Sequence, residues 1–266
     1  EKIMTETLHK NHDRYFIPGL SRGLRVLEII AEAGEPLTIA EIGKKLGVSR
    51  SSAFRITYTL EHLGFLTTDK SDKQYELGPR ILGLGFSYLN SQGVINTAKP
   101  HLEKLRDVTE VSSHLAIRDG RDVLYLDNIT SNTSFVSNIS TGERRPIYAS
   151  VLGWVLLRDL SDAEIVELYQ GVEFDKLTEH TPNSVEELIK CVRSAAKDGY
   201  AISRGFVQRG GSTITAPLLD DRGQVIAVID ISGPDSAFYF ERLQSFYVPT
   251  VVETAMAISR SLGHKS

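Results

Sequence analysis

The sequence predicts an α+β protein of two domains, a small helical domain followed by a larger one that mixes helices with a sheet. Its 266 residues exceed what one hydrophobic core usually organises. Apolar residues follow helical spacing through residue 64 and alternate as in strands further along the chain. Gly78 and Pro79 break the chain between these patterns. With 41% hydrophobic and 24% charged residues, the composition is that of an ordinary globular chain.

Two helices are expected at the start of the small domain. Ser21 can cap the first helix, whose apolar residues fall on one face and which ends at Gly34. Thr38 is followed three residues later by Glu41, and this capping box marks the start of a second helix. Gly47 ends that helix, because glycine readily adopts the left-handed conformation of a helix end. The second helix is therefore short.

A third helix follows after a tight turn at Gly47. Ser49 can cap it, and Gly64 lies just beyond its end. Its apolar residues recur at helical spacing and predict a buried face made of Ala53, Ile56, Leu60 and Leu63. A short helix, a glycine-containing turn and a longer helix are the elements of a helix-turn-helix. Residues 65–68 and 74–77 predict two short strands around a polar turn, which adds a β-wing.

Basic charge is concentrated in this small domain although the whole chain carries a net charge of -4. Residues 1–90 contain 12 Lys and Arg against 11 Asp and Glu, and residues 91–266 contain 18 against 23. No acidic residue lies between Lys44 and Arg55. This local excess of positive charge suits a phosphate backbone. The alternative is a solvated charged surface, which is the commoner origin of such a run.

The exposed face of the third helix is rich in hydrogen-bond donors and lacks acidic residues. The side chains expected to point outward near its start are Arg50, Ser51, Ser52, Arg55 and Thr59, with Ser49 at the cap. The second helix of a helix-turn-helix enters the major groove, where such donors suit phosphates and base edges. We therefore expect binding to double-stranded DNA, with phosphate contacts from Arg22, Lys44 and Lys45. A winged-helix module used only for protein contacts remains the alternative.

A connecting helix and a mixed domain are expected downstream. Residues 81–89 are mostly apolar and fit a helix between two domains, and Pro100 then opens an amphipathic helix with Leu102, Leu105 and Val108 inward. Alternating polarity predicts two hairpins, within residues 113–126 and 213–232. Two capping boxes predict further helices, Ser161 with Glu164 and Ser184 with Glu187, the second helix ending at Gly199. A last helix is expected from about Phe240 to Leu262.

Five segments of the chain form a set of motifs at distinctive spacing. They are residues 20–27 (LSRGLRVL), 37–42 (LTIAEI), 46–55 (LGVSRSSAFR), 63–65 (LGF) and 75–80 (YELGPR). This set resembles the IclR family of bacterial one-component transcriptional regulators. The resemblance continues to the C-terminus and leaves only the first eighteen residues outside it.

The resemblance implies a domain order and a function. The expected parts are a flexible tail (1–18), a winged helix-turn-helix DNA-binding domain (19–78), a linker helix (79–92) and a GAF-like effector-binding domain (93–266). The expected protein is a cytoplasmic regulator of a catabolic operon that responds to a small organic acid, aromatic acids included. It also implies a homodimer or a tetramer formed as a dimer of dimers, with dimer contacts through the first helix and residues 81–89. We expect no membrane partner, since no run of eighteen apolar residues occurs.

The family also implies where the effector binds. By position, the expected contacts are Ser150, Val151, Leu152, Gly153, Trp154, Ser203, Arg204, Thr213, Asp230 and Ser232. Asp230 stands within an apolar run, where a buried carboxylate needs a partner because burying an unpaired charge costs free energy. The alternative is that Asp230 faces solvent or caps a loop.

Two positions depart from the family pattern. Trp154 follows Gly153 where relatives carry a small residue and lysine, and Arg204 stands where relatives place acidic residues. An arginine in the pocket would bind a carboxylate through two parallel hydrogen bonds, which favours an anionic ligand held by Arg204 or Arg209. The alternative is that both are surface arginines.

Motifs of catalysis and of cofactor binding are missing from the sequence. It contains no phosphate-binding loop, complete dinucleotide glycine pattern, nucleophile elbow or paired-histidine zinc helix. The single cysteine, Cys191, excludes an internal disulfide, and His114 has no evident Ser or Asp partner. His9 and His12 lie in the tail, where a chance pair is more common than a metal site. We therefore expect no catalytic residue, cofactor or metal, and a GAF-like enzyme acting on a small molecule is the alternative.

Overall fold

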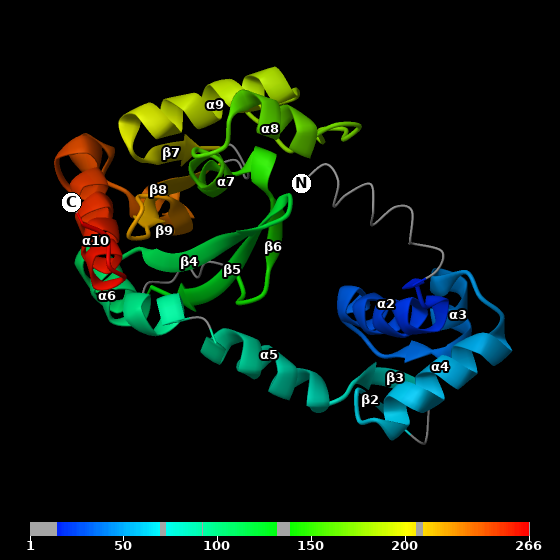
Figure 1. Cartoon of the computed structure of the whole chain (residues 1–266). Coiled ribbons are helices and arrows are strands. Elements are labelled where there is room, and N and C mark those ends of the chain that lie inside the picture. The colour runs from blue at the N-terminus through cyan, green and yellow to red at the C-terminus, as the bar shows by residue number, and fades with distance from the viewer. Residues whose placement is uncertain (1–14, 70–72, 92, 132–138, 206–209, 266) are drawn as a thin grey trace. The chain divides into compact units, whose positions relative to one another are not determined.

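The structure, a computed structural model, describes residues 15–69, 73–91, 93–131, 139–205 and 210–265 (Figure 1). The chain forms two compact units, residues 1–91 and 92–266. Among the described residues, no helix has the length and apolar character needed to cross a membrane. His9 and His12 lie outside the described residues.

The first unit contains the helix-turn-helix and the wing that the sequence predicts. Its described elements are α2 (Pro18–Ala33), β1 (Leu37–Thr38), α3 (Ile39–Leu46), α4 (Arg50–His62), β2 (Leu66–Asp69), β3 (Gln74–Leu77) and α5 (Arg80–Ser91). The strands form an antiparallel sheet in the order β1-β3-β2. Its core joins α2 to α3 and the sheet, through Val26, Ile30, Ile42, Leu66 and Tyr75.

Local signals in the sequence set the ends of α3 and the start of α4. The capping box is present, because the Thr38 hydroxyl accepts from the Glu41 amide while the Glu41 carboxylate accepts from the Thr38 amide at 2.8 Å. These hydrogen bonds stabilise the charged form and lower the pKa of Glu41. Gly47 ends α3 with a φ of 69°, in the left-handed region. The Ser49 hydroxyl accepts from the Ser52 amide and caps α4. The capping predictions at these residues are confirmed.

Three details of the first unit differ from the sequence predictions. α2 begins at Pro18 and not after Ser21, because proline has its φ preset for the first helical position. α4 ends at His62, so Leu63 falls outside the helix and is 44% exposed, while Thr57 joins the buried face. The two-residue strand β1 was not predicted, since so short a segment has no recognisable alternation.

A helix is present where the sequence predicts one after the wing, as α5, and its first residue is tied to the end of α4. The Arg80 guanidinium donates to the Leu63 carbonyl at 2.8 Å and lies 5.0 Å from the centre of the Phe65 ring. A cation at this carbonyl also interacts favourably with the negative end of the helix dipole. These contacts hold the start of α5 against the end of α4, the helix that carries the candidate DNA-binding face.

The second unit is an antiparallel six-stranded sheet with helices on both faces. The strands are β4 (Ser112–Asp119), β5 (Asp122–Ile129), β6 (Arg144–Pro146), β7 (Ala201–Arg204), β8 (Gly211–Leu219) and β9 (Val225–Pro234). Their order is β6-β5-β4-β9-β8-β7. The helices are α6 (Gly93–Thr109), α7 (Val151–Leu156), α8 (Asp162–Leu168), α9 (Val185–Asp198) and α10 (Val248–Ser261). The mixed α+β class is confirmed.

The two faces of this sheet have different partners (Figure 1). α6 and α10 cover one face, where the Ser113 hydroxyl donates to the Leu102 carbonyl of α6 and the Ser259 hydroxyl of α10 accepts from the Leu219 amide. α7 and α9 cover the other face, which we call the α7 face. Ala116 and Val228 belong to the α7 face, since both join the core cluster of α7. Strand alternation therefore assigns every second residue of β4 and β9 to this face.

Several boundaries in the second unit differ from the predictions. α6 begins at Gly93, so Pro100 lies inside the helix instead of opening it, and Val108 is exposed. The segment from Phe240 to Tyr247 forms a 3₁₀ turn and a π turn, and α10 starts only at Val248. Proline at the second position of α10 explains this start, because proline cannot donate a hydrogen bond to the preceding turn. The short elements β6, β7 and α7 were not predicted.

Candidate functional sites

The predicted DNA-binding side chains gather around the start of α4. Those fully on the surface are Ser49, Arg50, Ser51, Arg55 and Thr59, and Ser52 is half-buried. The Thr59 hydroxyl donates to the Arg55 carbonyl at 2.8 Å, so its proton is used within the helix. The Ser49 hydroxyl likewise donates to the Ser52 hydroxyl at 3.1 Å, whereas Arg50, Ser51 and Arg55 are exposed without an acidic neighbour among them. This arrangement suits hydrogen bonds to base edges and phosphates in the major groove.

Basic side chains flank this face from the two preceding helices. Lys44 and Lys45 are exposed in the last turn of α3, and Arg22 is exposed on α2. Arg25, also on α2, is instead paired with Glu28 at 2.9 Å and with Glu32 at 2.8 Å. Its charge is therefore neutralised within its own helix, whereas the predicted phosphate contacts Arg22, Lys44 and Lys45 stay on the surface.

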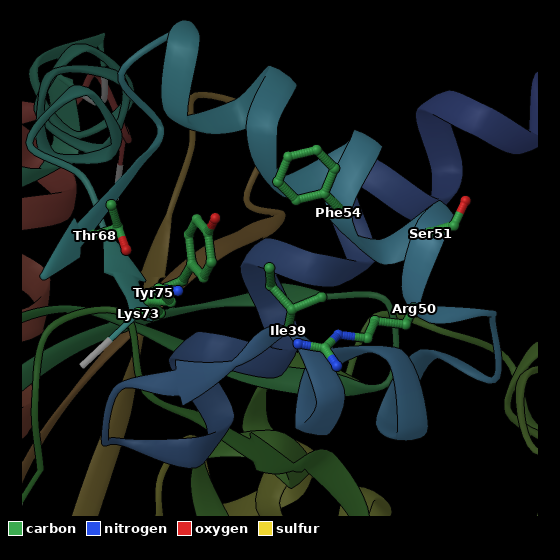
Figure 2. Close-up of a pocket in the computed structure, with 7 residues that line it drawn as sticks. All are labelled: Ile39, Arg50, Ser51, Phe54, Thr68, Lys73 and Tyr75. Atoms are coloured by element: carbon green, nitrogen blue, oxygen red, sulfur yellow. The ribbon is translucent and has the colours of Figure 1, made fainter. Parts of the chain in front are cut away.

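A hollow of about 670 Å³ lies between α4 and the wing (Figure 2). Its lining comes from three parts of the unit: Ile39 of α3, Arg50, Ser51 and Phe54 of α4, and Thr68, Lys73 and Tyr75 of the wing. Arg50 of α4, the recognition helix of the helix-turn-helix, and Lys73 of the wing both line this hollow, so that two cations lie around it. The hollow thus extends the candidate DNA-binding face from α4 to the wing.

A buried polar pair lies on the α7 face of the second unit. Nδ1 of His114 lies 3.1 Å from Oδ2 of Asp230, and both residues have no exposed surface. The Ser232 hydroxyl is 3.4 Å from the same Nδ1. The Tyr125 ring meets the His114 ring edge-on at 5.8 Å. Asp230 therefore has the partner that a buried carboxylate requires, and the alternative in which it faces solvent is wrong.

The strand register extends this pair into two polar rows across the sheet. One row joins Ser112 of β4 to Ser232 of β9, Thr213 of β8 and Ser203 of β7. The next row joins Asn128 of β5 to His114, Asp230 and Thr215. We call these eight residues the buried polar patch, although Asn128 and Thr213 are only half-buried. Such a concentration of hydroxyl and ionisable groups is unusual in a core, where polar groups cost free energy unless they are hydrogen-bonded.

Two atoms of the patch, Oδ1 of Asp230 and Oδ1 of Asn128, are buried without a hydrogen-bond partner among the described residues. The Asp230 charge and burial both raise the pKa of Tyr125, with burial the larger cause, so this hydroxyl stays protonated. An unsatisfied buried carboxylate oxygen costs free energy unless a donor reaches it. Oδ1 of Asp230 is therefore an acceptor whose hydrogen-bonding capacity is not used by the described residues.

The expected effector residues at positions 150–154 form α7 and its cap. The Ser150 hydroxyl accepts from the Leu152 amide, and the Trp154 indole donates to the Tyr148 carbonyl at 3.0 Å. Val151 and Leu152 are buried in the core cluster of the second unit. A Cβ atom on Gly153 would lie 2.2 Å from the Ile147 carbonyl oxygen. These contacts give the segment a structural role in placing α7 on the sheet.

Arg204 does not lie in an apolar pocket. Its side chain is 57% exposed, stacks on the Phe240 ring with a distance of 3.7 Å to the ring centre, and lies 4.0 Å from the Asp235 carboxylate. Strand alternation explains this position, because Ser203 points inward and its neighbour must point outward. The hypothesis of a desolvated arginine at this position is corrected accordingly. Phe206 and Arg209 lie outside the described residues.

The Ser232, His114 and Asp230 side chains do not have the geometry of a hydrolytic triad. The expectation that His114 lacks a Ser or Asp partner was wrong, since the pairing of β4 with β9 brings both residues to it. Both contacts, however, are made by the same nitrogen, whereas a triad uses one imidazole nitrogen for each partner. Burial raises the pKa of the Cys191 thiol, which opposes the thiolate form that a nucleophile needs. The described residues contain no metal-binding cluster of three or more His, Cys, Asp or Glu.

Comparison with known proteins identifies the family. The model described as "IclR helix-turn-helix domain" matches residues 19–70, and the model described as "Bacterial transcriptional regulator IclR C-terminal" matches residues 86–260. The chain belongs to the IclR family. It is a DNA-binding transcriptional regulator, and the IclR helix-turn-helix match contains the face built on α4.

Individual IclR-family relatives match over nearly the whole chain. The "Pca regulon regulatory protein" of Pseudomonas putida is 28% identical over 95% of this chain and 85% of its own length. "HTH-type transcriptional regulator KdgR" of Escherichia coli is 29% identical over 92% of this chain and 94% of its own length. The crystal structure of "a putative transcriptional regulator" from Rhodococcus sp. RHA1 has a TM-score of 0.80 at 30% identity, over 93% of this chain and 98% of that one.

The site residues predicted from the sequence do not include every residue of the two candidate sites. On the DNA-binding face they omitted Phe54 and Lys73, which line the hollow beside Arg50. In the second unit they omitted His114 and the hydroxyls that share its rows. A usable signal was present, because polar residues recur two apart in β4, β8 and β9, as Ser112 with His114 does in β4. Alternation in strands places such pairs on one face.

Proposed function

We propose that this IclR-family protein binds a specific operator through α4 and the wing and responds to a small hydroxylated organic acid held at the buried polar patch. Oδ1 of Asp230, buried and without a donor among the described residues, is the observation that carries the effector part. The regulator would act on a catabolic operon, as the name of the Pca regulon relative suggests. A protein that binds bacterial chromosomal DNA works in the cytoplasm, which is the location we propose.

The chemistry of the patch favours a ligand with both a hydroxyl and a carboxylate. A ligand hydroxyl can donate to Oδ1 of Asp230 and satisfy it. The hydroxyls of Ser203, Thr213 and Ser232 can donate to a carboxylate, since each lies in one row on the same face of the sheet. Among the originally expected contacts, these three and Asp230 support the proposal most directly. Ser150 to Trp154 support it by holding α7 over the sheet, and Arg204 acts outside the patch.

Binding can be detected by stabilisation of the full chain. A ligand selective for the folded state raises stability by mass action, by about 2.7 kcal/mol at one hundred times its dissociation constant. We expect hydroxylated acids to raise the melting temperature more than their deoxy counterparts, with 4-hydroxybenzoate against benzoate and lactate against propionate as the first pairs in a thermal-shift screen. The reason is that only the hydroxyl satisfies Oδ1 of Asp230. Ser232→Ala should weaken the shift.

Arg204→Ala is the matched control for this screen, because the Arg204 side chain is largely exposed beside Phe240. It should leave the ligand-induced shift unchanged. A hydroxylated acid and its deoxy counterpart that stabilise equally, or a strong loss of the shift in Arg204→Ala alone, would contradict the proposed site.

Operator binding depends most on Arg50, which is exposed at the first turn of α4. Loss of a bidentate contact to a base edge costs about 1 to 3 kcal/mol and relaxes specificity at one position. We expect Arg50→Ala to show this loss in fluorescence anisotropy with operator and scrambled duplexes. Arg222→Ala, which removes the same charge from an exposed turn of the second unit, should bind the operator as the unchanged protein does. Equal affinity of the unchanged protein for both duplexes across salt concentrations would refute specific binding.

A homo-oligomer is part of the proposed function. One recognition helix covers few base pairs, so two copies on a near-palindromic site about one helical turn apart are needed for genomic specificity. Exposed apolar residues suited to contact between copies occur on α2 and α5: Leu20, Leu24, Leu82, Leu84 and Tyr88. They support a homodimer, or a tetramer formed as a dimer of dimers.

No enzymatic reaction is part of the proposal. The Ser232 hydroxyl and the Asp230 carboxylate share one nitrogen of His114, and burial holds the Cys191 thiol protonated. Regulators of this family act by binding, so catalytic residues, a cofactor and a metal are not proposed.

A further inference from the structure

An aromatic ridge runs along the exposed side of the recognition helix. Phe54 is 49% exposed and Tyr58 is 59% exposed, and they lie one turn apart on α4. Their ring centres are 6.1 Å apart, and the Tyr58 ring stacks on His62 at 6.4 Å. Single exposed apolar residues are common on protein surfaces. Here, however, the ridge occupies the helix that the IclR fold presents to DNA.

Phe54 is the member of this ridge that lies beside the hollow (Figure 2). It shares the lining with Arg50 and Ser51 of the same helix and with Lys73 of the wing. Two cations around one hollow suit a phosphate backbone that passes between α4 and the wing. If one DNA strand passes through this hollow, the Phe54 ring in its lining meets the major-groove edge of a base of that strand, near the sugar-phosphate backbone.

We infer that Phe54 is a specificity-determining residue that reads the C5-methyl group of a thymine. A phenyl ring has no hydrogen-bonding atom, so it cannot satisfy the donors and acceptors of the other base edges. Covering such polar edges with an apolar ring would cost free energy. The thymine methyl is the only methyl group that the four bases present in the major groove, and it lies on the side of the base next to the backbone. The Tyr58 ring supports Phe54 from one turn away.

This inference rests on the proposed operator binding and can be tested separately from it. Duplexes are first selected from a random library with the full-length protein, and each thymine of the selected operator is then replaced by deoxyuridine, which lacks only the methyl group. We expect the unchanged protein to lose about fourfold in affinity at one position per half-site, the effect of one buried methyl group. Phe54→Ala should lose affinity for the thymine operator and show no further loss at that deoxyuridine.

Leu63→Ala is the matched control, because Leu63 is also an exposed apolar residue, 44% exposed, and lies just after α4. It should keep the full difference between thymine and deoxyuridine. Circular dichroism of each variant establishes that the fold is retained. The inference is overturned if Phe54→Ala still distinguishes thymine from deoxyuridine as the unchanged protein does, or if no thymine responds in the unchanged protein. A selection that yields no preferred duplex overturns the proposed operator binding as well.

Discussion

Gly153→Ala is expected to destabilise the second unit by about 3 kcal/mol or more, at the upper end of what overpacking a core costs. The added Cβ would lie 2.2 Å from the Ile147 carbonyl oxygen and 2.6 Å from the Ile147 Cα. Both are backbone atoms, so no side-chain rotation relieves the overlap, and α7 would have to leave its place on the sheet. Domains are stable by only about 5 to 15 kcal/mol. Trp154, the single tryptophan, is buried in this core and reports its unfolding in urea by fluorescence.

Gly93→Ala provides the control for this prediction in the same unit. A Cβ at Gly93 meets no atom within 4 Å, and the residue begins α6, where alanine favours the helix. Its urea midpoint should equal or slightly exceed that of the unchanged protein. A Gly153→Ala midpoint as high as that of Gly93→Ala would show that η1 (Ile147–Ala149) and α7 can separate without cost.

The first unit was predictable because its signals are local. Thr38 and Glu41 lie three residues apart, and the side chain of each accepts a hydrogen bond from the backbone amide of the other. The helix start that they predict therefore does not depend on residues far away in the chain. The same holds for Gly47, whose positive φ ends α3, and for the Ser49 cap. The ridge on α4 escaped prediction because exposure of Phe54 depends on which neighbours pack against α4. The start of α2 was missed because Pro18 and Ser21 both fit a helix start.

The second unit shows where a single sequence is insufficient. His114 and Asp230 are 116 residues apart, and only the pairing of β4 with β9 brings them together. The hairpins were predictable because turn residues join their two strands. No turn joins β4 to β9, the two central strands of the sheet, so their pairing was not predictable in this way. Arg204 was misplaced for a related reason, since a family position fixes the strand and not the direction of each side chain. Strand alternation decides that direction, and it turns Ser203 inward.

The His114–Asp230 pair carries the second large expected effect, because neither residue has any exposed surface. His114→Leu removes the partner of Oδ2 of Asp230, while Oδ1 has none among the described residues. Breaking one side of a buried pair costs about 3 to 5 kcal/mol, since the remaining charge stays buried without compensation. We therefore expect His114→Leu to lower the urea midpoint of Trp154 fluorescence strongly. The effect should appear in the second unit, which contains both the pair and Trp154.

The double variant His114→Leu with Asp230→Val decides whether the loss comes from the stranded carboxylate. Replacing both members of a buried pair by apolar residues is often neutral or stabilising, because no charge remains to be desolvated. Valine suits a strand, and Val228 already occupies the same face of β9. We expect the double variant to be more stable than His114→Leu alone, so that the second substitution restores free energy of unfolding although it removes another native side chain. If the two losses simply add, the stability contributed by Asp230 does not depend on His114, and the stranded carboxylate is not the cause of the loss in His114→Leu.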